Sequence, residues 1–311
     1  MPEKDRESTK APVQIPDGLS VGALSARERY RRWRFNSTDP DRFELWPGFR
    51  FLISELIHGS KSIVVGATVD GGRLLVARTK ISRSLVSREL WHSGYTVTIP
   101  EYRGKGIGRL LMQAELEQVT RFGGRFCDGY IARDNIASIR MCEGLGFRPL
   151  PFIRVHCQAK SPPATNRLKI SPLRCFDLRS FLPGLSSMEK TAGAKWIVVL
   201  AEEFVRCRQL LPWKRPTHGL YEIVWDGQTT GFARCGSGHV NFIFDPETLL
   251  EGGLKIVEGV VGALSEMGQT RKAFLFVNKD LWDQIAGATF AANFDFVYLW
   301  EPKSTAHHPG G

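Results

Sequence analysis

A glycine-rich turn between a strand-like segment and a helix-like segment most narrows the folds open to this chain. It reads Pro100-Glu-Tyr-Arg-Gly-Lys-Gly-Ile-Gly108 and lies between the alternating residues 94–99 and the helical spacing of 109–122. Such glycines let backbone N–H groups converge on one point beside a helix N-terminus, an arrangement suited to a pyrophosphate. The spacing differs from the Gly-x-Gly-x-x-Gly of dinucleotide folds, and no Ser or Thr follows Lys105 as in a P-loop.

The flanking patterns predict a mixed α/β sheet with a central crossover. Asp70-Gly71 between two β-rich runs predicts a hairpin. In the helix 109–122, Leu110, Leu111, Ala114 and Val119 are expected on one side and Glu115, Glu117 and Gln118 on the other. The remaining predicted elements of this half are a strand at 51–57, the hairpin strands 62–68 and 74–81, a strand at 126–132, a helix at 136–145 and a strand from Phe147.

The same order of elements recurs in the second half, which predicts an internal duplication. A shift of 146 residues places Pro100-Glu101 on Pro246-Glu247 and Asp134 on Asp280. A second Asp-Gly pair, Asp226-Gly227, again predicts a hairpin. The predicted elements are a long helix at 187–211, strands at 220–225, 230–235 and 240–244, a helix at 250–267, a strand at 273–277, a helix at 281–292 and a strand at 294–300.

The turn, together with Ala132-Arg133-Asp134-Asn135, Ala137-Ser138 and Leu145-Gly146-Phe147, resembles the GNAT superfamily of N-acetyltransferases. The resemblance covers about residues 45–155. It implies a fold of two tandem GNAT-like domains, each with a mixed, mostly antiparallel, splayed sheet flanked by helices. The implied segments are a leader at 1–16, a catalytic acetyl-CoA-binding domain at 17–157, a linker at 158–172, a degenerate GNAT-like domain at 173–303 and a tail at 304–311.

The resemblance also implies which residues bind acetyl-CoA or another short acyl-CoA. Backbone amides of the turn would bind the pyrophosphate, and free amides of the preceding strand would bind the pantetheine and acyl carbonyl. The Asn that opens the next helix would contact the CoA arm. By position these residues are Val97, Thr98, Ile99, Arg103, Gly104, Lys105, Gly106, Ile107, Gly108, Arg109, Asn135 and Ser138.

The sequence departs from the family at the usual proton donor. The family often has Tyr four residues before the Gly of Gly-Phe, where this chain has Cys142. A thiol can donate a proton, but the pattern favours a small buried residue of an amphipathic helix at this position, with water or another group as the donor. The amine must be neutral to attack, and Glu89, His92 and Tyr95 are the candidates for the base.

The second half lacks the features that suit the turn to an anion. Leu249, Leu250 and Glu251 align with Arg103, Gly104 and Lys105, and a carboxylate beside a pyrophosphate would oppose binding. We therefore expect no CoA site there. Six scattered cysteines have no zinc or redox spacing, so neither a metal nor a disulfide framework is predicted.

The positive charge is concentrated in the first half. Residues 1–160 hold 26 Lys and Arg against 17 Asp and Glu, and residues 161–311 hold 16 against 15. A polyphosphate cofactor suffices as the partner of that charge. Nucleic acid is a further interpretation of the basic residues Arg27, Arg29, Arg31, Arg32 and Arg34.

The expected function is acetyl or short acyl transfer to a primary amine of a small molecule, in a cytoplasmic protein without membrane segments. The alternatives are acylation of a protein amine or an aminoacyl-tRNA, and a CoA-binding or scaffold protein without turnover. The sequence predicts no oligomeric state.

Overall fold

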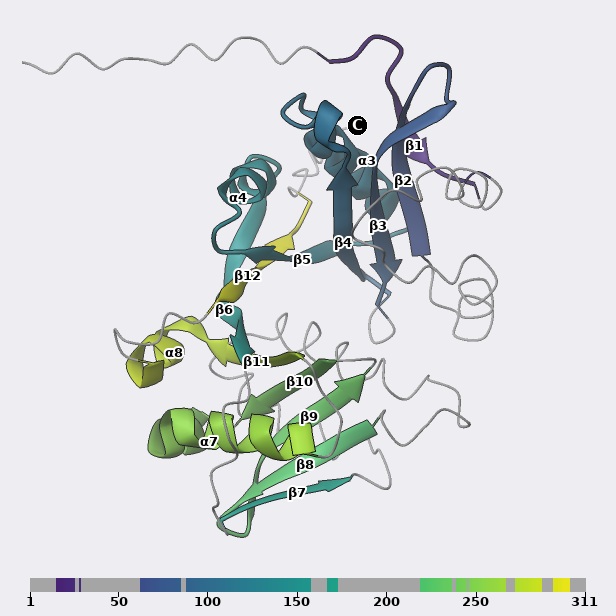
Figure 1. The fold of residues 1–311 in the computed structure, drawn as a ribbon. Coiled ribbons are helices and arrows are strands. Elements are labelled where there is room, and N and C mark those ends of the chain that lie inside the picture. Colours follow the sequence, from purple (N-terminus) through teal and green to yellow (C-terminus); the bar gives the residue numbers. More distant parts are fainter. Residues whose placement is uncertain are drawn as a thin grey trace, which may run out of the picture. The chain divides into compact units, whose positions relative to one another are not determined.

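The computed structural model describes residues 15–25, 28, 62–84, 88–157, 167–172, 219–236, 239–244, 246–266, 272–286 and 293–302. The basic residues Arg27 to Arg34, the expected strand 51–57 and the expected helix 187–211 lie outside these ranges. The chain divides into two compact units, one of residues 1–82 and 93–121 and the other of residues 83–92 and 122–311. Each is described by itself (Figure 1).

The first unit is a small antiparallel sheet with one helix on it. Strands β1 (Ser20–Ala23), β2 (Ser62–Val69) and β3 (Leu74–Arg83) pair in sequence order, and β4 (Leu90–Thr98) enters this unit at Ser93. A short 3-10 helix, η1 (Pro100–Tyr102), leads to α3 (Ile107–Arg121). The helix buries Ile107, Leu111, Leu116 and Val119, and the strands of this unit bury Val65 and Val76. This apolar stripe fixes which face of α3 meets the sheet.

The second unit is a longer sheet in which α7 and α8 share one apolar core with the strands. After the first three residues of β4, its strand order is β5 (Phe126–Ala132), β12 (Phe294–Trp300), β6 (Phe147–Cys157), β11 (Lys272–Asn278), β10 (His239–Phe244), β9 (Gln228–Gly236), β8 (Gly219–Trp225) and β7 (Leu168–Pro172). The core joins Ile153 and Leu275 from the sheet to Val260 and Val261 of α7 (Pro246–Glu266) and Trp282 of α8 (Lys279–Ala286). Helix α4 (Ile136–Glu143) connects β5 to β6.

The two halves of the sequence exchange strands in this sheet. Strand β12 from the end of the chain pairs antiparallel with both β5 and β6. Strand β6 in turn pairs antiparallel with β11 of the second half. A self-contained copy would pair β5 with β6 and β11 with β12. The compact units therefore cut the chain elsewhere than the domain boundaries expected from the sequence, which stay a prediction.

The structure gives the internal duplication a register. Both ends of β5 lie 146 positions before the corresponding ends of β11, and each strand is preceded by a parallel partner, β4 or β10. The hairpin β2–β3 has a register shift between Ala67 and Thr68, and the hairpin β8–β9 has one between Ile223 and Val224, which is 156 positions later. An irregularity that recurs at one offset indicates a repeated fold unit.

The two hairpin turns differ in length, 70–73 against 226–227, but both open with an Asp-Gly pair of positive φ. Asp70 and Gly71 have φ of 54° and 62°, and Asp226 and Gly227 have φ of 50° and 82°. Two successive residues with positive φ are typical of the type I′ turn, for which Asp-Gly is a favoured sequence. The prediction of two hairpins is therefore confirmed.

Four details differ from the sequence expectations. Glu115 was placed on the polar side of its helix but is fully buried, with Ile107, Leu111 and Val119 on the same face. Residues 168–172 of the expected linker form strand β7, which pairs with β8. Helix α7 begins at Pro246 rather than Leu250, with a kink at Gly253, and α8 begins at Lys279 rather than Leu281. Residues 287–292 of the expected helix lie outside the described ranges. No helix among the described residues is long and apolar enough to cross a membrane.

Candidate functional site

The glycine-rich turn is built as the sequence predicts, from left-handed glycines beside a helix N-terminus. Gly104 and Gly106 have φ of 76° and 70°, a region that side chains rarely adopt. Tyr102 N–H donates to the carbonyl of Ile99 (3.0 Å) and Arg103 N–H to that of Pro100 (3.1 Å), which closes η1. Helix α3 then starts within the turn. The glycines are therefore required by the backbone path.

Five successive backbone N–H groups of the turn have no acceptor among the described residues. They belong to Gly104, Lys105, Gly106, Ile107 and Gly108, whereas the amides of Arg109 and Leu110 already donate to the Gly106 carbonyl (3.0 and 3.2 Å). Successive unsatisfied N–H groups at the positive end of a helix dipole bind anions. The turn can therefore hold a phosphate or pyrophosphate through its backbone.

The two cationic side chains of the turn are held by local contacts. Arg103 Nε donates to the carbonyl oxygen of Thr98 (3.0 Å), which ties the turn to the end of β4. Lys105 Nζ lies 4.9 Å from the ring centroid of Tyr102. Arg103 thus shapes the turn, and both cations add positive potential near its amides.

The end of β4 and the residue after it are the three positions that the family resemblance assigns to the pantetheine and acyl group, and β4 neighbours β3 in the sheet. Val97 is exposed and Thr98 is half-buried, but the amide of Ile99 donates to the carbonyl of Val76 in β3 (3.0 Å). Ile99 is therefore held within the sheet. Of the three residues expected to bind pantetheine and acyl group, Val97 and Thr98 are the better candidates.

A buried polar network lies under this strand. Thr79 Oγ1 of β3 donates to Glu115 Oε1 of α3 (2.6 Å), and Ser93 Oγ of β4 donates to Glu115 Oε2 (2.8 Å). Thr79 Oγ1 also lies 2.8 Å from Thr96 Oγ1 of β4. Burial raises the pKa of Glu115 to about 7, and the two hydroxyl hydrogen bonds oppose this rise.

Strand β4 is irregular where this network meets it. Ser93 and Thr96 both contact Met112 Sδ of α3, at 3.6 and 4.0 Å. Residues three apart in a regular strand point to opposite faces, so the alternation shifts by one between them. The shift brings Thr96 to the helix-facing side immediately before Val97 and Thr98.

His92 is paired with a buried carboxylate in the second unit. Its Nδ1 is in ion-pair contact with Asp128 Oδ1 of β5, which is fully buried. The pairing of β4 with β5 runs from Leu90–Phe126 to His92–Asp128. His92 and Asp128 are therefore the last paired residues of the two strands, and the carboxylate fixes the orientation of the imidazole.

The other two candidates for the base, Glu89 and Tyr95, have fewer described contacts that bear on such a role. Glu89 precedes β4, and its Oε1 lies 3.6 Å from Arg125 Nη1, with both side chains largely exposed. Tyr95 lies on β4, but its side chain is outside the described part of the structure. An exposed pair of this kind has a small electrostatic effect.

Helix α4 holds the remaining predicted residues. Asn135 caps the helix, since its Oδ1 accepts from the amide of Ser138 (3.2 Å). Cys142 is buried. The neighbouring Glu143 accepts a hydrogen bond from Tyr298 Oη of β12 (3.1 Å), and burial together with this contact raises the pKa of Tyr298 to about 12. The exchanged strand thus anchors the end of the helix that carries Cys142.

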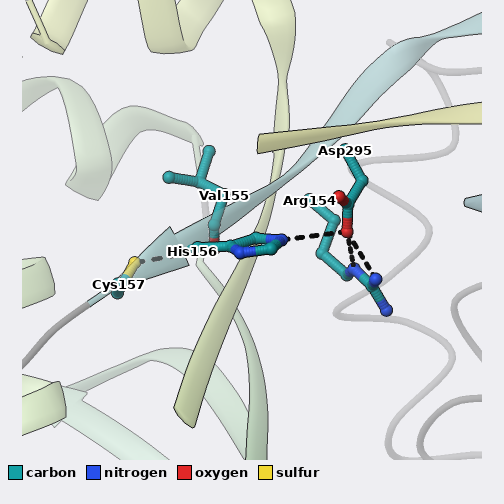
Figure 2. A network of polar contacts seen from close by, with 5 residues as sticks. All are labelled: Arg154, Val155, His156, Cys157 and Asp295. Atoms are coloured by element: carbon teal, nitrogen blue, oxygen red, sulfur yellow. Dashed lines mark hydrogen bonds and ion pairs between the residues drawn. The ribbon is translucent and has the colours of Figure 1, made fainter. Parts of the chain in front are cut away.

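A second polar cluster lies where β6 meets β12. Figure 2 shows Arg154 and His156 both directed at Asp295, which is almost fully buried. Arg154 Nε donates to Asp295 Oδ2 (2.8 Å), and His156 Nε2 lies 3.0 Å from the same oxygen. The guanidinium also stacks near the rings of Tyr130 (4.2 Å) and Phe274 (4.8 Å). These contacts join four strands from both halves of the sequence.

Sequence reasoning missed Glu115, Thr79 and Asp128. Glu115 follows Ala114 in a segment where charged residues ordinarily lie in solvent, so helical spacing alone assigned it to the polar side. A usable signal was present, because Glu115 lies four residues after Leu111 and four before Val119, both of which were assigned to the apolar side.

Comparison with known proteins gives one family match and solved structures of similar fold. Residues 23–147 match the family model described as the acetyltransferase (GNAT) family. A GCN5-related N-acetyltransferase from Sphaerobacter thermophilus aligns with 93% of this chain and 97% of its own, at 16% identity and a TM-score of 0.52. A tandem GNAT protein from the clavulanic acid biosynthesis pathway covers 91% and 98%, at 12% identity and a TM-score of 0.50.

These solved structures establish the fold at low identity, and a search of curated proteins by sequence finds no match. The fold class predicted from the sequence, two tandem GNAT-like domains, is confirmed by the tandem relative, which aligns over nearly its full length. The chain thus has the fold of tandem GNAT proteins, and its residues 23–147, which include the glycine-rich turn, match the acetyltransferase (GNAT) family.

Proposed function

We propose that this protein transfers an acetyl or short acyl group from CoA to a primary amine of a small molecule. The observation that carries the proposal is the run of five backbone N–H groups, from Gly104 to Gly108 at the N-terminus of α3, for which the described part of the chain offers no acceptor. Dedicated donors of this kind suit the pyrophosphate of CoA. Lys105 and Arg109 add positive charge at the same turn, and Asn135 with Ser138 is proposed to contact the CoA arm.

The proposed reaction is direct attack of the amine within a ternary complex. The bound thioester supplies an activated acyl group, and no covalent link to the protein is needed. Backbone amides at Val97 and Thr98 are proposed to hold the acyl carbonyl, since donors aimed at a developing oxyanion lower the barrier. Cys142 is buried and adjoins the Glu143–Tyr298 contact, which favours a packing role over proton donation.

The amine must lose a proton at a pH near 7 for attack. Of the groups considered from the sequence, His92 is in contact with Asp128 and Glu89 with Arg125. The first pair orients a largely buried imidazole, whereas the second is exposed and has a small electrostatic effect. His92, Glu89 and Tyr95 stay proposals for the base, each testable by its own substitution.

The second half is proposed to bind no CoA. At the offset of 146 residues the turn corresponds to the start of α7, where Leu249 is buried and Gly253 interrupts the helix with φ of 54°. Glu251 adds a negative charge where the first half has Lys105. The proposed roles of the second half are packing and forming part of the acceptor site.

The test is release of free CoA thiol from acetyl-CoA in the presence of a panel of small primary amines, a lysine peptide and an aminoacyl-tRNA. The proposal expects turnover that depends on a small amine. Turnover with the peptide or the tRNA alone would replace the acceptor class. Tight acetyl-CoA binding without turnover on any acceptor would leave a CoA-binding protein and contradict the proposed transfer.

A further inference from the structure

Glu115 is the buried acid of the first unit, and hydroxyl groups surround it. Its side chain has no solvent exposure, and both oxygens accept from side-chain hydroxyls, Oε1 from Thr79 (2.6 Å) and Oε2 from Ser93 (2.8 Å). Two hydroxyls on different strands aimed at one carboxylate form a built site. An ionised carboxylate is costly to bury, so a chain keeps one in this way only where the surroundings support it.

The network leads from this carboxylate to the surface of β4. Thr79 has a single hydroxyl proton, which it donates to Glu115. The hydrogen bond between Thr79 and Thr96 (2.8 Å) is then donated by Thr96. Thr96 is exposed, and its oxygen keeps a lone pair for an outside donor. It directly precedes Val97 and Thr98, the residues proposed to hold the acyl carbonyl.

The second half shows that the fold does not require these polar residues. At the offset of 146 residues, Glu115 corresponds to Val261. The pairings of the hairpins place Thr79 at the position of Ala233, and those of β4 with β5 and β10 with β11 place Ser93 at the position of Phe242. Val261, Ala233 and Phe242 are all buried in one apolar cluster. The same fold positions are therefore packed without polar groups in one half and with a carboxylate network in the other.

Building on the proposed transfer function, we propose that Glu115 receives the proton of the acceptor amine through Thr96 and Thr79. The amine N–H donates to Thr96 Oγ1 as the nitrogen–carbon bond forms and the carbon–sulfur bond of the thioester breaks. The Thr96 proton passes to Thr79, and the Thr79 proton passes to Glu115 Oε1. The carboxylate becomes a carboxylic acid, solvent protonates the departing thiolate, and Glu115 later returns its proton to solvent by the same route.

In the described parts of α3 and of strands β1 to β4, no charged group faces Glu115 closely enough to outweigh burial in setting its pKa. Strands β1 and β2, which pack against α3, contain no titratable residue, and Arg78 and Lys80 of β3 flank Thr79 and so alternate to the opposite face. In the described part of β4 within this unit the titratable residue is Tyr95. On α3 the titratable residues Arg109, Glu117 and Arg121 are exposed. Burial is thus the main influence on the pKa of Glu115, which lies at about 7.

The test compares the pH dependence of kcat/KM for wild type, Glu115→Gln, Thr79→Val and Thr79→Ser. The expected wild-type profile rises through an ionisation near pH 7. We expect Glu115→Gln and Thr79→Val to lower kcat/KM by about 10²-fold, the lower end of what general-base catalysis contributes, and to remove that ionisation. Thr79→Ser keeps the hydroxyl and should restore both. Glu117→Gln, on the exposed face of the same helix, is the matched control.

Acetyl-CoA affinity, measured by calorimetry, separates the possible failures. Unchanged affinity in Glu115→Gln with a lost ionisation supports the relay. An unchanged pH profile in Glu115→Gln and Thr79→Val, with the ionisation lost in His92→Gln instead, would overturn the relay and leave the transfer function standing. Absence of turnover by the wild type on every amine would overturn both.

Discussion

The two halves of this protein build the same fold elements around opposite interiors. In the first half a left-handed glycine turn leads into α3, and α3 buries Glu115 against the hydroxyls of Thr79 and Ser93. In the second half the corresponding segment is already helical from Pro246, and the position of Glu115 is Val261 in an apolar cluster. The difference teaches that the open turn and the buried carboxylate are additions to the fold. We attribute both to the acyl-transfer role that we propose for the first half.

The largest effect is expected when the second half is given the acid of the first. Val261→Glu buries a carboxyl group among Val257, Val260 and Leu264, with no hydroxyl donors placed for it. We expect unfolding free energy to fall by about 3 kcal/mol or more at pH 8, as for an unpaired buried charge. The loss should shrink at pH 5, where the carboxyl is neutral. Urea denaturation at both pH values measures this, and undiminished stability at pH 8 would break the comparison.

The acid of the first half should itself cost stability as pH rises. The pKa of Glu115 is raised from 4.5 to about 7 in the folded state, so between these values the folded chain holds more protons than the unfolded one. The stability attributable to Glu115 therefore falls with rising pH across this window and is constant above it. Relative to Glu115→Gln, wild type should lose about 3 kcal/mol between pH 4.5 and pH 8, at 1.36 kcal/mol per pKa unit.

Stability of the two variants measured as a function of pH checks this prediction. A difference between them that stays constant from pH 4.5 to pH 8 would mean that Glu115 titrates as an exposed carboxylate. The exposed Glu117→Gln variant should follow wild type at every pH.

A smaller loss of stability is expected when the contact between β12 of the second half and β6 of the first half is weakened. Asp295→Asn weakens the contacts of β12 with Arg154 and His156 of β6, and leaves the guanidinium of Arg154 without its countercharge. We expect a loss of about 2 kcal/mol, less than for a fully buried pair because Arg154 is 24% exposed. Asp226→Asn is the control, since its pair with Arg167 is exposed and Asn tolerates positive φ. Equal losses in the two variants would mean that the β6–β12 cluster adds nothing to stability.

The smallest predicted effect is on acetyl-CoA affinity, and it distinguishes Gly104 of the turn from Gly253 of α7. Gly104 and Gly253 both have positive φ, and both have open space where a Cβ would lie. Alanine at either position strains the backbone by about 1–2 kcal/mol. We expect acetyl-CoA affinity to fall about tenfold in Gly104→Ala and to be unchanged in Gly253→Ala. A similar fall in both variants would show that binding responds to general destabilisation and does not depend on the turn.

Much of the architecture follows from short-range sequence signals. The Asp-Gly hairpins and the glycine turn were predictable because each depends on residues within a few positions of one another. The exchange of β12 and β6 was not, because a strand pattern carries no information about its neighbour in the sheet. The partners of Glu115 were missed for the same reason. Thr79 and Ser93 lie 36 and 22 residues away, and spacing along one helix cannot reveal hydroxyls on two strands.

The most direct test of a working first half beside a half without cofactor is the stoichiometry of acetyl-CoA binding to the intact chain by isothermal titration calorimetry. We predict one molecule per chain, with the affinity reduced in Gly104→Ala and retained in Gly253→Ala. Two molecules per chain, or one whose binding depends on Gly253 and not on Gly104, would contradict this account.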